Sequence, residues 1–339
     1  MNLNQLKSVA KAMVADGKGI LAADESSPTI KKRFDKIDTQ STEENRRRYR
    51  EMLFTTPELA DYIGGVILYD ETIRQSTTDG VPFAKYLADL GMVPGIKVDT
   101  GAKSLAGFPG EKITEGLDGL RERLKEYYEL GARFAKWRAV IDIADGIPTD
   151  FCLKANAHAL ARYAALCQEA NIVPIVEPEV IMDGGHSIDR CAEVTSRALE
   201  IVFAELKAHR VVLEGIVLKP NMVISGTTAS KRAGPEDVAK ATLKVLKAHV
   251  PAEVPGIAFL SGGQSAEEAT EHLAIMNRMG TLPWELSFSY GRALQAPALD
   301  AWHGKEAQFK SGQQALFKRA KLNSMAHLGK YESAMESAA

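Results

Sequence analysis

Eight short apolar segments recur along the chain and constrain its fold more than any other feature. Each is too short for a helix and rich in residues such as valine, isoleucine and phenylalanine, which is typical of a buried β-strand. Helical patterns fill the intervals between them. The segments cover residues 17–24, 63–70, 92–99, 134–143, 172–180, 213–220, 256–263 and 285–292.

The intervening helices are indicated by apolar spacing and by residues that favour helix ends. Helical spacing of apolar or alanine residues predicts helices over 117–131, 149–170 and 187–209. Capping-box spacing or an N-terminal proline predicts that further helices begin near Ser41, Ser265 and Pro235.

Eight strands that alternate with helices over 339 residues predict an α/β fold of the (β/α)8 TIM-barrel type. The alternative is a doubly wound open sheet, but no Gly-x-Gly-x-x-Gly turn follows any predicted strand. No linker rich in proline, glycine or serine divides the chain. We therefore expect a single domain over residues 1–331 and a small, polar, mobile tail over 332–339.

Charge and hydropathy exclude several classes of partner. The 42 basic and 44 acidic residues give a formal charge of −2, so nucleic acid and anionic membranes should not attract the chain. No apolar run approaches the roughly 18 residues of a membrane span, and residues 1–19 lack the apolar core of a signal peptide. The three cysteines lack metal-type spacing and fit a reducing compartment. The expected location is the cytoplasm.

Charged residues within or directly after the predicted strands point to a catalytic site. In a TIM barrel, catalytic groups lie at the C-terminal ends of the strands, and strand side chains alternate between two faces. Unpaired buried charges cost several kcal/mol each, so a cluster of opposite charges at the barrel mouth indicates an active site. The alternative is that the charges extend into water from the strand ends. The residues are Asp24, Lys97, Asp99, Lys136, Arg138, Glu177, Glu179 and Lys219.

Lys219 has the most suggestive sequence context among these residues. Apolar residues precede it and Pro220 follows, which predicts an extended backbone and apolar surroundings. Such surroundings, with Lys136 as a cationic neighbour, would lower its pKa from about 10.4. A neutral amine can form a Schiff base with a ketone or aldehyde. The alternative is a lysine that is only ion-paired to Glu177 or Glu179.

Two glycine-containing strand ends suggest phosphate binding. Residues 261–263 (Ser-Gly-Gly) and 290–292 (Tyr-Gly-Arg) follow the last two predicted strands, where barrels often bind phosphate. The glycines alone would fit a tight turn equally well, but the guanidinium of Arg292 matches phosphate. Residues 31–33 (Lys-Lys-Arg) offer a second basic site, although such runs are usually solvated. Two phosphate sites beside a nucleophilic lysine would suit a bisphosphorylated sugar.

Metal binding has little support in the sequence. The seven histidines fall mostly in helical patterns, and no pair of them has ligand spacing. His186, in a loop near Asp183, is interpreted as an ordinary surface residue. We expect neither a metal nor a cofactor.

Several segments together resemble class I fructose-1,6-bisphosphate aldolase, and the resemblance extends from about residue 15 to residue 331. It implies a (β/α)8 barrel and metal-independent cleavage of fructose 1,6-bisphosphate to dihydroxyacetone phosphate and glyceraldehyde 3-phosphate. It also implies a homotetramer. The segments are ILAADES (20–26), GIKVD (95–99), FAKWR (134–138), VEPEV (176–180), LEGIVLKPNM (213–222), FLSGGQS (259–265) and SFSYGRALQ (287–295).

The resemblance implies catalytic roles for five residues. Lys219 matches the Schiff-base lysine. Glu177 matches the acid and base of carbinolamine formation and dehydration, and Glu179 its hydrogen-bonding neighbour. Asp24 matches the acid associated with carbon–carbon cleavage, and Lys136 a catalytic lysine.

The resemblance also implies substrate contacts. Residues of the last two strand ends match the site for the phosphate of the ketose half, Arg138 matches a phosphate-side arginine, and Lys97 and Arg33 match groups around the other phosphate. Thr29 stands after Pro28, where many relatives have Gly-Ser. The full set is Arg138, Lys97, Arg33, Thr29, Ser261, Gly262, Ser289, Gly291 and Arg292.

The chain departs from the family at its end. Vertebrate relatives end in a tyrosine that aids proton exchange on the enamine, whereas this chain ends in Ser-Ala-Ala, with Tyr331 as its last tyrosine. We therefore expect a fixed group at the barrel mouth to supply that proton. The preference between bisphosphate and monophosphate substrates stays open.

Three other classes of protein fit the sequence less well. A transaldolase-like Schiff-base lyase is disfavoured by the paired phosphate sites. A barrel that serves only in binding or scaffolding would ordinarily lose Lys219, Glu177 or Asp24. A zinc-dependent aldolase would need clustered histidines.

Overall fold

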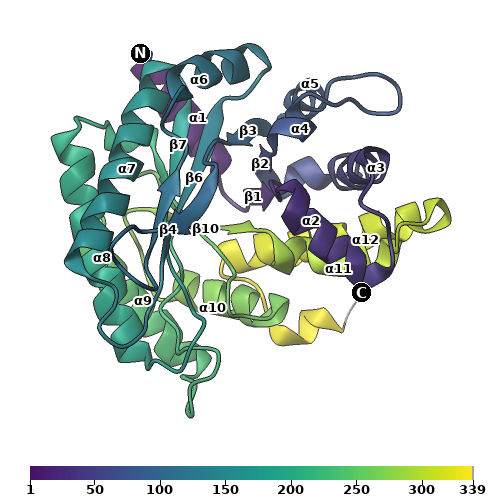
Figure 1. The fold of residues 1–339 in the computed structure, drawn as a ribbon. Coiled ribbons are helices and arrows are strands. Elements are labelled where there is room, and N and C mark those ends of the chain that lie inside the picture. Colours follow the sequence, from purple (N-terminus) through teal and green to yellow (C-terminus); the bar gives the residue numbers. More distant parts are fainter. Residues whose placement is uncertain (338–339) are drawn as a thin grey trace.

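Eight parallel strands close into a barrel in the computed structural model, which describes residues 1–337 (Figure 1). The order round the barrel is β1, β10, β9, β8, β7, β6, β3 and β2. Each strand lies within one of the eight predicted segments, so the TIM-barrel prediction is confirmed. The strands are β1 (Gly19–Ala22), β2 (Ile63–Leu68), β3 (Val93–Lys97), β6 (Phe134–Ile141), β7 (Val173–Val180), β8 (Val217–Leu218), β9 (Gly256–Phe259) and β10 (Glu285–Tyr290).

Helices surround the barrel (Figure 1). Among the described residues, none of them combines the length and apolarity that crossing a membrane requires. The first six are α1 (Leu3–Met13), α2 (Ser27–Phe34), α3 (Glu43–Phe54), α4 (Asp70–Ile73), α5 (Phe83–Asp89) and α6 (Leu120–Glu129). The others are α7 (Asp150–Glu169), α8 (Ile188–Ala208), α9 (Pro235–His249), α10 (Ala266–Arg278), α11 (Arg292–Trp302) and α12 (Phe309–His327).

The barrel interior is a packed apolar core closed at one end by α1. Leu6, Ala10 and Met13 of that helix join inward-facing strand residues in one buried cluster. The ring of Phe134 fills part of this space, and a Cβ at Gly95 would lie 2.2 Å from it. Glycine on β3 is therefore required by the aromatic ring on β6. This packing closes the N-terminal end and leaves the other end open for a site.

A second and larger core lies between the strands and the surrounding helices. On β6, Trp137 points outward and packs against Tyr163 of α7, with ring centroids 5.6 Å apart. Its neighbours Lys136 and Arg138 line the cavity at the barrel mouth, because strand side chains alternate. The aromatic contact thus fixes the strand that carries two of the predicted site residues.

The helix starts follow the predicted signals with one exception. Ser265 forms a complete capping box with Glu268, and Pro235 is the first residue of α9. The predicted cap at Ser41 is wrong, because the side chain of Thr42 accepts the backbone hydrogen bond from Asn45 instead.

A two-stranded antiparallel sheet was not predicted. It consists of β4 (Gly101–Ser104) and β5 (Lys112–Glu115), which follow β3. These strands are short and mostly exposed or half-buried, so they give no apolar signal. The hydroxyl of Thr114 on β5 donates to the carbonyl oxygen of Arg138 at 2.7 Å, which attaches the sheet beside the barrel mouth.

The predicted mobile tail covers residues 332–339, of which 338 and 339 lie outside the described residues. A 3₁₀ turn, η5 (Ser333–Glu336), packs against the body of the protein. Glu336 is 2.6 Å from the buried Arg319 of α12 and accepts a hydrogen bond from the Tyr331 hydroxyl. These contacts argue against free motion of residues 332–337, whose mobility stays a prediction. Tyr331 itself is buried.

Candidate active site

A cavity of about 630 Å³ opens at the C-terminal ends of the barrel strands. All the catalytic and binding residues predicted from the sequence line it. They are Asp24, Thr29, Arg33, Lys97, Lys136, Arg138, Glu177, Glu179, Lys219, Ser261, Gly262, Ser289, Gly291 and Arg292.

Strand register explains why residues far apart in sequence meet here. Lys97 on β3 is directly opposite Lys136 on β6, and Arg138 is opposite Glu177 on β7. The next pairing joins Val176 to Leu218, which brings Lys219 beside Glu177. The inward-facing charges therefore form a layer across neighbouring strands.

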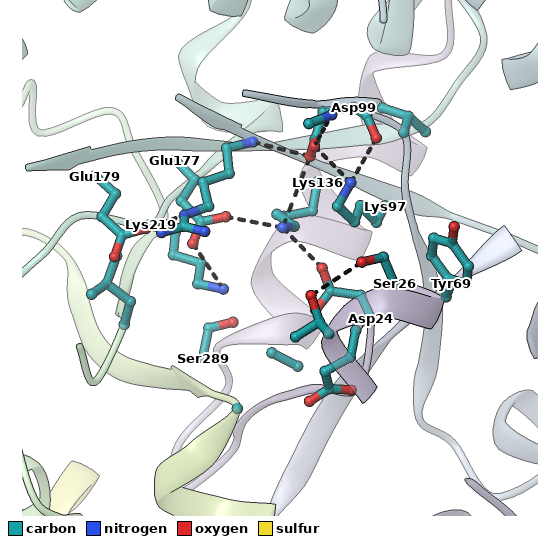
Figure 2. Close-up of a pocket in the computed structure, with 18 of the residues that line it drawn as sticks. Asp24, Ser26, Tyr69, Lys97, Asp99, Lys136, Glu177, Glu179, Lys219 and Ser289 are labelled. Carbon is teal, nitrogen blue, oxygen red and sulfur yellow. Dashed lines mark hydrogen bonds and ion pairs between the residues drawn. The ribbon is translucent and has the colours of Figure 1, made fainter. Parts of the chain in front are cut away.

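Glu177 lies between two lysines at the centre of this layer (Figure 2). Its Oε1 is 3.2 Å from Nζ of Lys219, and its Oε2 is 3.4 Å from Nζ of Lys136. The three side chains are only 4–5% exposed. A carboxylate held in this way can exchange a proton with a group that reacts at Lys219.

Lys136 also contacts two aspartates. Its Nζ is 2.8 Å from Asp24 and 4.0 Å from Asp99. Burial would lower the pKa of Lys136, but Asp24, Glu177 and Asp99 outweigh burial and raise it well above its usual value. Burial would raise the pKa of Asp24, but Lys136 and Lys219 hold it well below its usual range. Lys136 is therefore a cation and Asp24 an anion at neutral pH.

The apolar surroundings predicted for Lys219 are wrong in part. Apolar strand residues do enclose its stem, since Ile216, Val217 and Leu218 are fully buried. The amine, however, faces Glu177. This is the ion pair that the sequence analysis gives as the alternative, and the register between β7 and β8 selects Glu177 as the partner.

Arg138 and Glu179 form a second ion pair, between β6 and β7. Burial raises the pKa of Glu179, Arg138 opposes this and Glu177 adds to it, so the pKa lies above its usual value. The Arg138 side chain is 42% exposed and lies at the rim, where a substrate can reach it.

The two predicted sets of phosphate-binding residues lie on opposite walls of the barrel. In the strand order, β9 and β10 lie across from β3 and β6, which carry Lys97, Lys136 and Arg138. On the first wall, α11 begins at Arg292, and its Gly291 cap provides no side-chain hydrogen bond to the terminal amides. The hydroxyl of the buried Ser289 has no hydrogen-bond partner within residues 1–337. This wall therefore offers donors to an anion.

Arg33 was grouped with Lys97, and the structure corrects this. A Cβ at Gly291 would lie 3.9 Å from Nη2 of Arg33, so this guanidinium belongs to the wall of β10. Its neighbours Lys31 and Lys32 do not line the cavity, and Lys31 pairs with Asp35 at 2.8 Å. Only the arginine of the basic run thus faces the site, because a helix turns successive residues to different sides.

Some cavity residues were not predicted. Tyr69 and Asp70 close the second apolar segment just as Asp24 closes the first, so a signal was present. Glu25 is buried and pairs with Arg33 and, at 2.7 Å, with Arg50 of α3. That contact gives no local pattern in the sequence. The remaining unpredicted polar lining residues include Ser26, Thr100, Arg123 and Tyr127.

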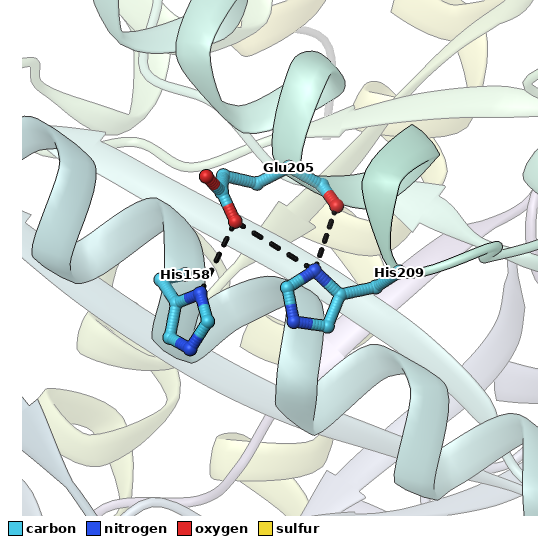
Figure 3. A group of neighbouring side chains, drawn as sticks. All are labelled: His158, Glu205 and His209. Carbon is cyan, nitrogen blue, oxygen red and sulfur yellow. Dashed lines mark hydrogen bonds and ion pairs between the residues drawn. The ribbon is translucent and has the colours of Figure 1, made fainter.

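The structure also corrects the analysis of the histidines. His158 and His209 lie together, with ring centroids 4.9 Å apart, and Glu205 lies beside both (Figure 3). Glu205 and His209 are four residues apart, which is a helical ligand spacing, and the packing of α7 against α8 adds His158. His186 belongs to no such group within residues 1–337.

Comparisons with known proteins agree with the geometry. The family model described as Fructose-bisphosphate aldolase class-I matches residues 5–339. A "Probable fructose-bisphosphate aldolase class 1" of Xanthomonas campestris is 60% identical over 98% of this chain and 100% of that protein. "Fructose-bisphosphate aldolase 4, cytosolic" of Arabidopsis thaliana is 53% identical over 93% of this chain and 81% of that protein. A solved Plasmodium falciparum fructose-bisphosphate aldolase, in complex with TRAP and a small molecule inhibitor, superimposes with a TM-score of 0.96 at 49% identity, covering 97% of this chain and 96% of that one.

Proposed function

The chain belongs to the class I fructose-bisphosphate aldolase family, and we propose that Lys219 is the lysine that carries its Schiff base. The reaction is the reversible, metal-independent cleavage of fructose 1,6-bisphosphate to dihydroxyacetone phosphate and glyceraldehyde 3-phosphate. The observation that carries the assignment to Lys219 is its contact with Glu177, 3.2 Å away inside the cavity.

Schiff-base formation needs a nucleophile and a proton carrier in contact. Glu177 first accepts a proton from the Lys219 side chain, and the neutral amine then adds to the C2 carbonyl of the substrate. A proton passes from this nitrogen to the former carbonyl oxygen, which gives a carbinolamine. Glu177 then donates a proton to the departing hydroxyl, which leaves as water, and an iminium forms. Lys136, charged and 3.4 Å from the other Glu177 oxygen, stabilises the carboxylate that results.

Cleavage needs a base on the other side of the substrate. Asp24 is ionised and follows β1, which lies opposite β7 in the barrel. It accepts the proton of the C4 hydroxyl, the C3–C4 bond breaks, and its electron pair moves to the iminium to give an enamine. The aldehyde product leaves first. Protonation of the enamine at C3 and hydrolysis then release the ketone product.

The two walls of the cavity orient the bisphosphate. We assign the ketose-half phosphate to Ser261, Gly262, Ser289, Gly291 and Arg292. The reasons are the start of α11, which no side chain caps, and the Ser289 hydroxyl, which has no partner in the described part of the chain. Arg33 joins this group. The other phosphate is assigned to the opposite wall, to Lys97 and Arg138. Thr29 also lines the cavity, one helical turn before Arg33 on α2.

A cleavage assay tests the assignment. Lys219→Ala should abolish turnover of fructose 1,6-bisphosphate, and Lys219→Arg should do the same, because a guanidinium cannot form the Schiff base. Both variants should unfold cooperatively, since Glu177 keeps Lys136 as a partner. Substantial turnover by either variant would refute the role of Lys219.

We further propose that the protein is a single-domain, cytoplasmic homotetramer. The location is supported by relatives named cytosolic in Arabidopsis thaliana and cytoplasmic in Spinacia oleracea. The tetramer rests on the family resemblance alone. Light scattering should give four times the mass of one chain, and the mass of a monomer or dimer would contradict this.

A further inference from the structure

We propose that His158, Glu205 and His209 bind one divalent ion of the zinc type, outside the catalytic cavity (Figure 3). His158 lies on α7, Glu205 lies on α8, and His209 is the residue that ends α8. None of the three lines the cavity at the barrel mouth. The ion would thus be independent of the Schiff-base reaction.

Helix packing brings the three side chains together. Glu205 and His209 are one helical turn apart, so they share a face of α8. That face is directed toward α7, since the carboxylate of Glu205 contacts His158. An ion bound by two ligands of α8 and one ligand of α7 would link these two helices.

The distances fit a metal ion. Oε2 of Glu205 is 3.2 Å from Nδ1 of His158. One ligand atom from each residue lies within 4.8 Å of the other two. A tetrahedral zinc ion with ligands at about 2.0–2.1 Å holds them roughly 3.4 Å apart. Two imidazoles and a carboxylate form a donor set that zinc and neighbouring transition metals accept.

A backbone contact prepares His209 for this role. Its Nδ1 is 2.9 Å from the carbonyl oxygen of Glu205, to which an N–H at Nδ1 donates. In that tautomer Nε2 carries the lone pair. A backbone carbonyl is a common outer partner of a metal-binding histidine, where it orients the ring. Ligation through Nε2 keeps this hydrogen bond.

The site is open to solvent. The side chains of His158, Glu205 and His209 are 54%, 30% and 23% exposed. An ion can enter without unfolding, and water can complete its coordination as in other three-ligand zinc sites. The same exposure means that substitutions of His158 should leave the fold intact.

The test is a titration of the chelator-treated full chain with Co²⁺ and Zn²⁺. We expect one ion per chain, a visible absorption band of tetrahedral Co²⁺, and a thermal midpoint that rises with Zn²⁺ concentration. His158→Ala and His209→Ala should each weaken binding at least tenfold. The matched controls, His249→Ala and His303→Ala, should bind as the wild type does. No stoichiometric binding, or equal binding in cluster and control variants, would overturn the proposal.

A second variant separates ion binding from a merely structural ion pair. Glu205→Gln keeps the backbone carbonyl but removes the carboxylate, so it should weaken Zn²⁺ binding. It should change the thermal midpoint of the zinc-free protein by less than about 2 °C, because exposed ion pairs contribute little to stability. A large fall in that midpoint with no effect on Zn²⁺ binding would show a structural pair instead. Chelation should leave cleavage of fructose 1,6-bisphosphate unchanged in every variant.

Discussion

Nζ of Lys219, directly after β8, and Oε1 of Glu177, within β7, lie 3.2 Å apart. The second oxygen of the same carboxylate faces the cationic Lys136. One carboxylate is thus in contact with the proposed nucleophile and with a fixed positive charge.

Glu177→Gln should slow formation of the Schiff base by a factor of about 10²–10⁴, the usual contribution of a positioned acid or base. An amide keeps the shape of the carboxylate but cannot transfer its proton. Stopped-flow kinetics with dihydroxyacetone phosphate would measure the rate, and a phosphorylated competitive inhibitor would check that binding persists. A variant with an unchanged rate would remove Glu177 from the proton transfer.

Asp24→Asn should destabilise the protein in a pH-dependent way. The pKa of Asp24 is lower in the folded protein than in the unfolded chain, where it is about 3.9. The ion pair of Asp24 therefore stabilises the fold fully above about pH 4. This stabilisation is lost as the pH falls toward the pKa of Asp24 in the folded protein. The difference from wild type should therefore be about 1.5–3 kcal/mol at pH 7 and shrink below about pH 4.

Thermal unfolding between pH 3 and pH 7 would measure this difference. Asp35→Asn is the control, because its pair with Lys31 is exposed and should contribute little. A destabilisation by Asp24→Asn that stays constant across the pH range would show that the loss comes from packing and not from charge.

Arg292→Ala should raise the Michaelis constant for phosphorylated substrates about 10- to 150-fold, as expected for the loss of one charge-assisted contact worth about 1.5–3 kcal/mol. The side chain lies at the start of α11 on the wall with the unpartnered Ser289 hydroxyl. Unphosphorylated analogues should be affected much less. Equal effects on both kinds of substrate would indicate a structural arginine.

Deletion of residues 332–339 should lower stability without slowing the reaction. The deletion removes Glu336 from the buried Arg319, at a cost of about 1–3 kcal/mol. Turnover should change by less than about threefold, under ~0.7 kcal/mol in barrier. Glu336→Gln, which keeps the segment, should reproduce part of the loss of stability.

Isotope exchange from dihydroxyacetone phosphate measures the chemical role of this segment separately. Both full-length and truncated protein should exchange at similar rates, because we expect a fixed group at the mouth to protonate the enamine. An exchange rate that falls tenfold or more with normal substrate binding would assign the segment a chemical role.

The barrel and most of its site could be predicted because they depend on local periodicity. Buried strands are visible as apolar runs, and a period of two places Lys136 with Arg138, and Glu177 with Glu179, on one face. The strand ends then converge by the rules of the fold. The predicted fold was therefore enough to place Asp24 and Lys219 in the same cavity.

Contacts between distant elements could not be predicted in this way. The choice of Glu177 over Glu179 as the partner of Lys219 depends on strand register, and the position of Arg33 beside Gly291 depends on how α2 packs. His158 meets Glu205 only because α7 and α8 lie together. Such contacts depend on tertiary packing, which single-chain patterns do not encode.

The most direct measurement is borohydride reduction in the presence of dihydroxyacetone phosphate, followed by peptide mapping. Reduction converts the iminium to a stable secondary amine on the lysine that formed it. The account predicts a single label, on Lys219, which disappears in Lys219→Arg and requires the substrate. A label on Lys136 or Lys97, or no label at all while the enzyme turns over, would contradict it.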